Sequence, residues 1–323
     1  MALDAPSAAF VEAARRNAGK PREEMSPAEA REATAKMRAV MADGPAMEAV
    51  VDLDARGGDG TVPARLFVPE GGVRGLIVYF HGGGWVVGSL AEFDPLCREL
   101  AQATGCAVVA VQYRKAPEHP YPDPVEDAWS SLLWIVERQQ ALVGRSLPII
   151  VGGDSAGGNL AIAVTMRARS AGAPALAGQL LIYPVADCDF DRPSYLDPEN
   201  QLSLTRSAMM WYWNQYAPDA ARRVEPELSP CRASDLTGLP PAIILTAEHD
   251  VLRDEGEAYA ARLVEAGVPV IHKRFAGQLH AFAMLVGFLP GSASAVSFIG
   301  DAVRRVLSSL DNRDHPVSEG TRT

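Results

Sequence analysis

Short apolar, β-branched runs alternate with longer helical segments along most of the chain, and this alternation constrains the fold more than any other feature. Most of these runs are almost continuously apolar, which is typical of strands covered on both faces. The pattern predicts an α/β fold with a mostly parallel, eight-stranded sheet flanked by helices. The eight runs are residues 48–55, 62–69, 75–81, 106–113, 147–153, 178–185, 241–248 and 270–275.

Helical segments fill the spaces between these runs. Two of them end at Gly172 and Gly267, where a helix commonly turns into the left-handed region. A strand followed by a helix and then another strand is typical of a doubly wound α/β domain. The predicted helices are residues 93–105, 124–142, 155–172, 254–267 and 293–310.

Two regions interrupt the alternation. Residues 1–46 are helical in pattern, and Ser26–Glu29 has the N-cap serine, the proline and the glutamate of a capping box. Residues 186–230 contain a segment rich in proline and aspartate and then an aromatic helix. We expect the two regions to pack together as a cap over the strand ends. The predicted α/β core is then residues 47–185 and 231–312, with a polar tail at 313–323.

Composition and charge exclude several classes of partner. The 323 residues are 48% hydrophobic and 22% charged, as in an ordinary globular protein. A net charge of -10 disfavours nucleic acid, which attracts basic faces. No signal-peptide core and no run of eighteen apolar residues is evident, so we expect a cytoplasmic protein without membrane insertion. The four cysteines lack metal or disulfide spacing and are interpreted as reduced packing residues.

A serine lies between glycines where one predicted strand meets a helix. Gly153, Ser155 and Gly157 match G-x-S-x-G, the motif of a sharp strand-to-helix turn that presents a serine hydroxyl at the carboxyl edge of a sheet. A serine hydroxyl becomes a good nucleophile only when a base takes its proton and a third group holds that base. In this architecture the acid and then the histidine follow the serine along the chain.

Three histidines follow a possible acid. His272 lies within a predicted strand and His315 in the tail, whereas His280 occupies the loop after the last strand and is the favoured base. The candidate acids are Glu248, Asp250 and Asp254. Glu248 is assigned to a strand end and Asp254 to the first turn of a helix, which favours Asp250, with Asp254 as the alternative.

The run His81-Gly82-Gly83-Gly84-Trp85 follows the third predicted strand. Three residues without side chains allow backbone N–H groups to approach a developing oxyanion. A dinucleotide-binding loop is the competing interpretation, but G-x-G-x-x-G would need glycine where Val87 stands. The sequence therefore predicts acyl transfer rather than dinucleotide binding, and no metal or organic cofactor.

Taken together, these motifs resemble the hormone-sensitive-lipase-like esterases of the α/β-hydrolase fold, the bacterial group IV lipolytic enzymes. The resemblance spans nearly the whole chain and is carried by HGGGW at 81–85, YRKAPEHPYPDPVEDA at 113–128, GDSAGGNL at 153–160, DVLRDEGEAYA at 250–260 and HAF at 280–282. It implies a helical cap formed by the N-terminal helices and the insertion after the sixth strand.

The resemblance also implies residue roles. Ser155 would be the nucleophile, Asp250 the orienting acid and His280 the base, and the N–H groups of Gly83, Gly84 and Ala156 would form the oxyanion hole. The chain departs from the family pattern at two positions: Ala281 stands where glycine is frequent, and Val251 where proline is frequent. Neither departure removes a catalytic atom.

Other residues of these motifs have structural interpretations. Asp154 and His81 are expected to hold their loops, and Arg114, Glu118 and His119 to form a buried polar brace. The aromatic helix is expected to be a packed cap. The predicted substrate-binding residues are Trp85, Met209, Met210 and Trp213.

The expected activity is hydrolysis of carboxylic esters through an acyl-enzyme. The resemblance implies short acyl chains, about two to eight carbons long, because the family's capped pocket is closed. The same triad would also serve an amidase, a lactonase or a deacetylase, and the sequence does not separate them. A ligand receptor on this fold is a remote alternative, because all three catalytic residue types persist. By resemblance, a homodimer through the edge strand near residues 270–275 is expected.

Overall fold

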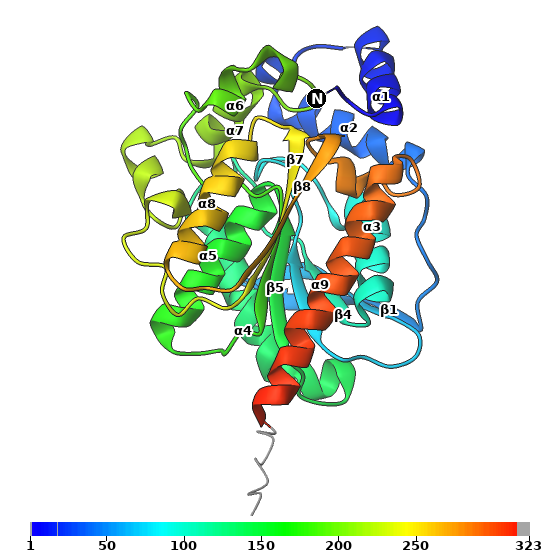
Figure 1. Cartoon of the computed structure of the whole chain (residues 1–323), viewed down its shortest axis with the longest axis vertical. Coiled ribbons are helices and arrows are strands. Elements are labelled where there is room, and N and C mark those ends of the chain that lie inside the picture. The colour runs from blue at the N-terminus through cyan, green and yellow to red at the C-terminus, as the bar shows by residue number, and fades with distance from the viewer. Residues whose placement is uncertain (1, 18, 315–323) are drawn as a thin grey trace, which may run out of the picture.

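The computed structural model describes residues 2–17 and 19–314 (Figure 1). Within them, the strands form one eight-stranded sheet in the order β1-β2-β4-β3-β5-β6-β7-β8. The pairings β1–β2 and β2–β4 are antiparallel, and all others are parallel, which confirms the predicted α/β sheet. The strands are β1 (Ala49–Arg56), β2 (Thr61–Val68), β3 (Leu76–Phe80), β4 (Ala107–Val111), β5 (Ile149–Asp154), β6 (Gly178–Ile182), β7 (Ala242–His249) and β8 (Val270–Leu279).

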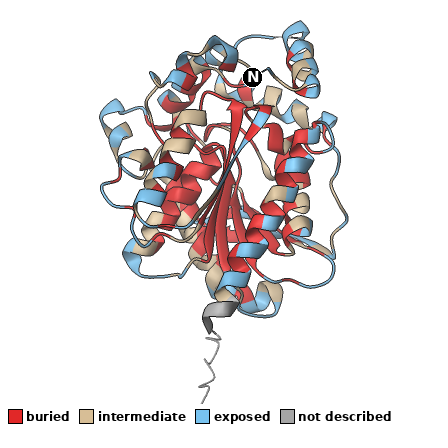
Figure 2. Cartoon of the chain, viewed as in Figure 1, coloured by how far each residue is buried: buried red, intermediate tan, exposed pale blue. Residues whose placement is uncertain are grey.

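Helices cover both faces of this sheet. Alternate residues of a strand point to opposite faces, so β3 places Ile77 and Tyr79 in one hydrophobic cluster and Val78 and Phe80 in the other. The first cluster is covered by α3 (Leu90–Thr104) and α9 (Pro290–Asp314), and the second by α4 (Asp123–Val143), α5 (Ala156–Ala171) and α8 (Arg253–Glu265). The central strands are buried throughout (Figure 2), as their continuous apolar composition predicts.

The two regions outside the alternation lie at the carboxyl ends of the strands (Figure 1). Ser26 forms the predicted capping box with Glu29, and the Ser207 hydroxyl in the second region donates to Glu23 in the first, at 2.6 Å. The N-terminal elements are α1 (Ala5–Arg16), η1 (Arg22–Glu24), α2 (Pro27–Ala35) and η2 (Lys36–Val40). The insertion contains α6 (Pro193–Leu196), η3 (Pro198–Asn200), α7 (Arg206–Tyr216), η4 (Ala220–Val224) and η5 (Pro230–Arg232).

The prediction of a buried polar brace is wrong for Glu118, which is exposed and ties the N-terminal region to the core. Arg31 of α2 donates to both carboxylate oxygens of Glu118 and to the backbone oxygens of Val86 and Ala116. This guanidinium lowers the pKa of Glu118 to about 2. Arg114 instead binds the buried carboxylate of Asp127 in α4. The sequence missed Arg31, because its partner lies 87 residues away.

The last strand is longer than predicted. β8 continues to Leu279 rather than ending at residue 275, and the register with β7 shifts between Ala247 and His249. Gly277 allows the continuation, because its φ of +69° is a left-handed conformation that few residues adopt. His280 therefore follows the strand directly. The predicted tail from 315 onward, with His315, lies outside the described residues.

Candidate active site

Ser155 occupies a sharp turn between β5 and α5. Its φ of 52° and ψ of -119° are strained for a residue with a side chain. A Cβ at Gly157 would overlap the carbonyl oxygen of Phe80, and one at Gly153 the carbonyl of Gly157. The Ser155 N–H donates to Ile182 of β6 at 2.9 Å, which fixes the turn to the neighbouring strand. The two flanking glycines are therefore required by the close approach of the backbone.

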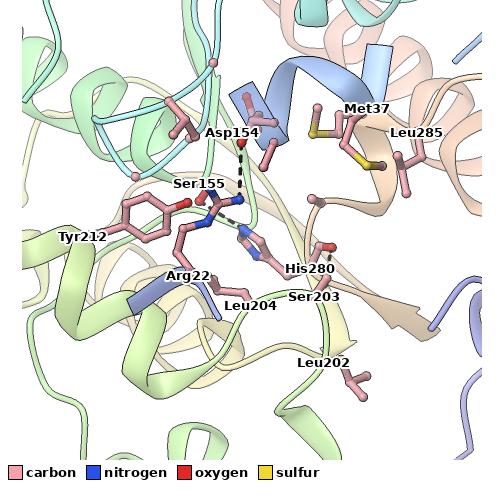
Figure 3. A pocket seen from close by; sticks show the side chains of 18 of the residues that line it. Arg22, Met37, Asp154, Ser155, Leu202, Ser203, Leu204, Tyr212, His280 and Leu285 are labelled. Atoms are coloured by element: carbon pink, nitrogen blue, oxygen red, sulfur yellow. Dashed lines mark hydrogen bonds between the residues drawn. The ribbon is translucent and has the colours of Figure 1, made fainter. Parts of the chain in front are cut away.

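Three polar side chains from three strand ends, Ser155, Asp250 and His280, meet at this turn, and Figure 3 shows Ser155 and His280 facing each other. His280 Nε2 lies 3.1 Å from Ser155 Oγ, and His280 Nδ1 lies 2.7 Å from Asp250 Oδ2. The second Asp250 oxygen accepts from the N–H of Leu252 at 2.9 Å. Ser155 and His280 are each 7% exposed and Asp250 is 1% exposed. The arrangement has the order of contacts that a serine nucleophile, its base and an orienting acid require.

The alternative acids and bases have other partners. Asp254 accepts from the N–H of Ser194 at 2.8 Å, and Glu248 accepts from the N–H of Gly277 at 2.8 Å. His272 Nε2 lies 3.0 Å from the hydroxyl of Thr246. Of the three candidate acids, Asp250 is the one whose carboxylate contacts His280 in the described structure.

The glycine loop after β3 lies beside Ser155. Gly83 and Gly84 have φ of +116° and +56°, and a Cβ on Gly84 would overlap the ring of Tyr212. Ala156 is the first residue of α5, where backbone N–H groups have no intrahelical partner. Neither Gly83 nor Gly84 donates its N–H to a protein acceptor within the described residues. These N–H groups are therefore available to an oxygen placed above Ser155.

His81 fixes this loop, as expected. The Nδ1 atom of His81 lies 2.7 Å from the carbonyl oxygen of Gly82, which can only accept a hydrogen bond. On the other side of the ring, Nε2 of His81 lies 3.1 Å from the side-chain nitrogen of Gln112. Burial lowers the pKa of His81 to about 3, so the ring is neutral at neutral pH. A proton on Nδ1 and an acceptor at Nε2 satisfy both contacts.

Asp154 supports the same loop from the nucleophile's side. Its Oδ1 accepts from the Tyr79 hydroxyl at 2.9 Å and from the N–H of Gly82 at 2.8 Å. Burial raises the pKa of Asp154 to about 6, although both hydrogen bonds oppose the shift. Asp154 therefore supports the loop, and its ionisation is less favourable in the folded protein than in the unfolded chain.

We expect Asp154→Asn to change how stability depends on pH. The carboxyl of the unfolded chain ionises near pH 4, and the folded one near pH 6. The folded state thus holds the extra proton in this window, so the ionised group lowers the free energy of unfolding progressively as the pH rises through it. The side-chain oxygen of asparagine can accept the hydrogen bonds from Tyr79 and Gly82, and asparagine does not ionise. Urea unfolding across the window should show the variant gaining up to about 3 kcal/mol relative to wild type by neutral pH; parallel curves would contradict the prediction.

A cavity of about 400 Å³ opens above Ser155 between the cap regions and the core. Ser155, His280, Gly83 and Gly84 line its base. Its other walls are mainly apolar and include Phe10, Met37, Leu204, Met209, Tyr212, Met284 and Leu285. The hydroxyl of Ser203 in the cap donates to the backbone oxygen of His280 at 2.9 Å, so the cap also holds the histidine.

The predicted substrate-binding residues are only partly placed there. Met209 lines the cavity, but Trp85, Met210 and Trp213 do not. Trp85 and Trp213 are fully buried, and Trp85 stacks on Tyr216 with ring centroids 4.1 Å apart. Met210 is 38% exposed on the outside of α7. These three assignments are corrected. Trp213 lies on the buried face of α7 but not on the part that faces the cavity, Met210 lies on its exposed face, and Trp85 of the glycine loop packs under α7.

Tyr212 was missed, although it lies on α7 between Met210 and Trp213. The overlap that a Cβ on Gly84 would make with its ring shows how closely α7 approaches the glycine loop. A signal in the sequence would have been the spacing of three positions from Met209 to Tyr212, which places both on one side of a helix.

Trp213 and Met209 should therefore respond differently to truncation. We expect Trp213→Ala to lower the free energy of unfolding by about 3 kcal/mol or more, because it removes a fully buried ring. Met209→Ala should instead change the acyl-chain preference, because it enlarges the cavity. Urea denaturation and ester-series kinetics separate the two effects, with exposed Met210→Ala as the control. A changed chain-length profile with unchanged stability in Trp213→Ala would contradict this placement.

The two departures from the family pattern keep the site intact. Ala281 has φ of 68°, a left-handed conformation that explains why glycine is frequent there. The Val251 side chain is buried and its carbonyl accepts from the Ser194 hydroxyl at 2.6 Å. Within the described residues, no group of three or more metal-ligating side chains occurs and no helix is long and apolar enough to cross a membrane.

The sheet, the serine turn and the serine–histidine–aspartate contacts define an α/β hydrolase. The chain belongs to the α/β hydrolase fold family, whose pattern matches residues 77–284. It is 35% identical to an ethyl acetate hydrolase of Pseudomonas putida, over 95% of this chain and 100% of the relative. It is 39% identical to the carboxylic ester hydrolase LipN of Mycobacterium tuberculosis, over 81% of this chain and 71% of the relative.

Solved structures agree with this assignment. The crystal structure of a thermostable esterase from Pseudomonas putida has a TM-score of 0.87 at 35% identity, over 95% of this chain and 98% of that chain. An α/β hydrolase mutant from the metagenome of Lake Arreo, Spain, has a TM-score of 0.89 at 33% identity, over 96% of this chain and 99% of that chain. The predicted family, fold and enzyme class are confirmed.

Proposed function

We propose that this chain is a serine carboxylesterase that hydrolyses short-chain esters, about two to eight acyl carbons long, through an acyl-enzyme. The observation that carries the proposal is the continuous contact from Asp250 through His280 to Ser155 at the base of a cavity. The names of the relatives support an ester as the substrate. A receptor on this fold would not need all three side chains in contact.

In the proposed acylation step, Ser155 Oγ attacks the ester carbonyl carbon while His280 Nε2 takes the hydroxyl proton. The carbonyl oxygen becomes an anion, which the N–H groups of Gly83, Gly84 and Ala156 receive. Asp250 holds the proton on His280 Nδ1 and stabilises the imidazolium that forms. The C–O bond to the alcohol then breaks, and the alcohol leaves with the proton from Nε2.

Deacylation uses the same groups in the reverse sense. Water enters the place of the alcohol and loses a proton to His280 Nε2 as its oxygen attacks the acyl carbon. The same N–H groups receive the second oxyanion. Ser155 Oγ then leaves, recovers its proton from the imidazolium, and the carboxylic acid is released.

The size and the lining of the cavity support short acyl chains. At about 400 Å³ it lies at the lower end of the usual range for ligand pockets, and its walls are mainly apolar. Elements from both cap regions, including α1, α2 and α7, contribute to those walls. This geometry favours small dissolved esters over aggregated long-chain lipid, which would need an open surface.

The test is a series of p-nitrophenyl esters from acetate to palmitate, with intact mass measured after a fluorophosphonate. We expect activity to peak at short chains and one adduct to form, located on Ser155 by peptide mapping. A matched p-nitroanilide, hydrolysed far more slowly, separates an esterase from an amidase. A wild type that neither labels nor turns over any ester would overturn the proposal.

The predicted dimer stays a prediction. β8 lies at one end of the strand order, so one side of residues 270–275 has no neighbouring strand within the described sheet. Light scattering on the purified chain would measure its mass in solution.

A further inference from the structure

A cationic side chain from the N-terminal cap region reaches the active-site cavity. Arg22 of η1 lies among the cavity-lining residues, with its guanidinium on the side of Ser155 and Tyr212 in the view of Figure 3. It is the one lysine or arginine that lines the cavity within the described residues. A charge in a mainly apolar substrate cavity calls for a partner.

The protein does not supply that partner. Arg22 Nη1 donates to the carbonyl of Ala30 at 2.8 Å and contacts Met25 Sδ at 3.8 Å, and Nη2 donates to the Thr34 hydroxyl at 3.3 Å. All three acceptors are neutral. Among the side chains that the structure describes, residues 2–17 and 19–310, no carboxylate lies within ion-pair distance of Arg22.

Part of the guanidinium is left available. Arginine has five N–H donors, and the Nε–H of Arg22 makes no hydrogen bond to a described protein group. Elsewhere in this chain, Nε and Nη2 act together to hold a carboxylate, as in Arg65 with Asp52, Arg167 with Glu227 and Arg222 with Glu225. The Nε side of Arg22 is therefore the side that commonly binds a carboxylate.

Tyr212 adds a second polar group to the same wall. Its ring is buried beside the glycine loop, and its hydroxyl makes no hydrogen bond to a described residue. Burial raises the pKa of Tyr212, while the nearby positive charge of Arg22 opposes the shift, so the two groups are electrostatically close. The phenol stays protonated at neutral pH and is a neutral hydrogen-bond donor.

We propose that Arg22, with the Tyr212 hydroxyl, recognises a carboxylate carried by the ester substrate, so that this esterase prefers esters bearing an acidic group. The proposal rests on the proposed esterase function. The carboxylate belongs either to the acyl part or to the alcohol part of the substrate. The recognising chemistry is the same in both cases.

The test uses two pairs of esters that differ only in charge. The first pair places the acid in the acyl part: monoethyl glutarate is compared with the ethyl ester in which an isopropyl group replaces the carboxylate. The second pair places the acid in the alcohol part: the acetate of γ-hydroxybutyrate is compared with the acetate in which an isopropyl group replaces the carboxylate. Released acid is titrated at constant pH for wild type, Arg22→Met, Arg22→Lys and Arg16→Met. Arg16 is the matched control, because it is an exposed cap arginine that does not line the cavity.

We expect Arg22→Met to lower the ratio of kcat/KM for the acidic over the neutral ester by about tenfold or more in at least one pair. Arg22→Lys should recover part of the ratio, and Arg16→Met should leave it unchanged. The pair that responds identifies which half of the substrate carries the acid. A purely structural role for Arg22 in holding α2 would slow both members of a pair equally, and an unchanged ratio in both pairs would overturn the proposal.

Binding separates this proposal from the esterase function. The affinities of the two acidic esters are measured by calorimetry on Ser155→Ala with and without Arg22→Met, where no turnover is needed. Affinity about tenfold weaker without the arginine supports carboxylate recognition even if the chain hydrolyses no ester. If each acidic ester binds equally tightly with and without the Arg22→Met substitution, carboxylate recognition is overturned, even if neutral esters are hydrolysed.

Discussion

Ser155→Ala should lower kcat for a short-chain ester by about 10⁶-fold, to a residual rate that still exceeds that of the ester in water. The substitution removes the oxygen that lies 3.1 Å from His280 Nε2, and no covalent intermediate can then form. The residual rate would come from the N–H groups of Gly83, Gly84 and Ala156, which are backbone groups that the substitution keeps. Stopped assays with high enzyme concentration measure so slow a rate.

Two controls make this result specific to the proposed mechanism. The double variant Ser155→Ala, His280→Ala should be no slower than the single variant, because the two side chains act as a unit. The free energy of unfolding should change little, since only one hydroxyl is lost from the turn. If the double variant were slower by the product of both single effects, His280 would act independently of Ser155 and the proposed roles would be wrong.

Much of the fold could be predicted because the strand signal is local. Continuous apolar composition identified β3 through β7, whose ends differ from prediction by a few residues. The capping box at Ser26 is equally local and was confirmed. β8 was predicted too short, because its continuation depends on the pairing with β7 and on the left-handed turn at Gly277. Such pairing is set by residues distant in sequence.

Chain order and strand ends narrowed the catalytic candidates to a few residues, with Asp254 left as the alternative to Asp250 until the contact with His280 distinguished them. Parallel strands bring their carboxyl ends to one edge, so residues after β5, β7 and β8 must meet there. The substrate-facing residues could not be predicted in the same way. Met209, Tyr212 and Trp213 all lie on one short helix, and the approach of that helix to the glycine loop decides which faces the cavity. Arg22 could not be predicted either, because it belongs to none of the sequence motifs.

Asp250→Asn should lower kcat by about 10⁴-fold, with a much smaller change in stability than in rate. His280 Nδ1 lies 2.7 Å from Asp250 Oδ2 in a buried contact, and a carboxylate there can only accept. The proton is thereby kept on Nδ1, and Nε2 is free to take the proton of Ser155. An asparagine can place its NH₂ group at this position and donate to Nδ1, which moves the ring proton to Nε2. The base would then be blocked.

Asp254→Asn is the matched control, because it makes the same chemical change four residues further on. Asp254 accepts from the N–H of Ser194, which holds the insertion against α8, and from Nε of its neighbour Arg253; neither contact involves His280. Activity should stay within about threefold of wild type, since only an outlying hydrogen bond is weakened. The pH profile distinguishes the two variants further: raising the pH should not restore the activity of Asp250→Asn, because its ring holds the wrong tautomer. If Asp254→Asn were the slower variant, the acid would have been assigned to the wrong carboxylate, and the contact between Asp250 and His280 would serve the fold alone.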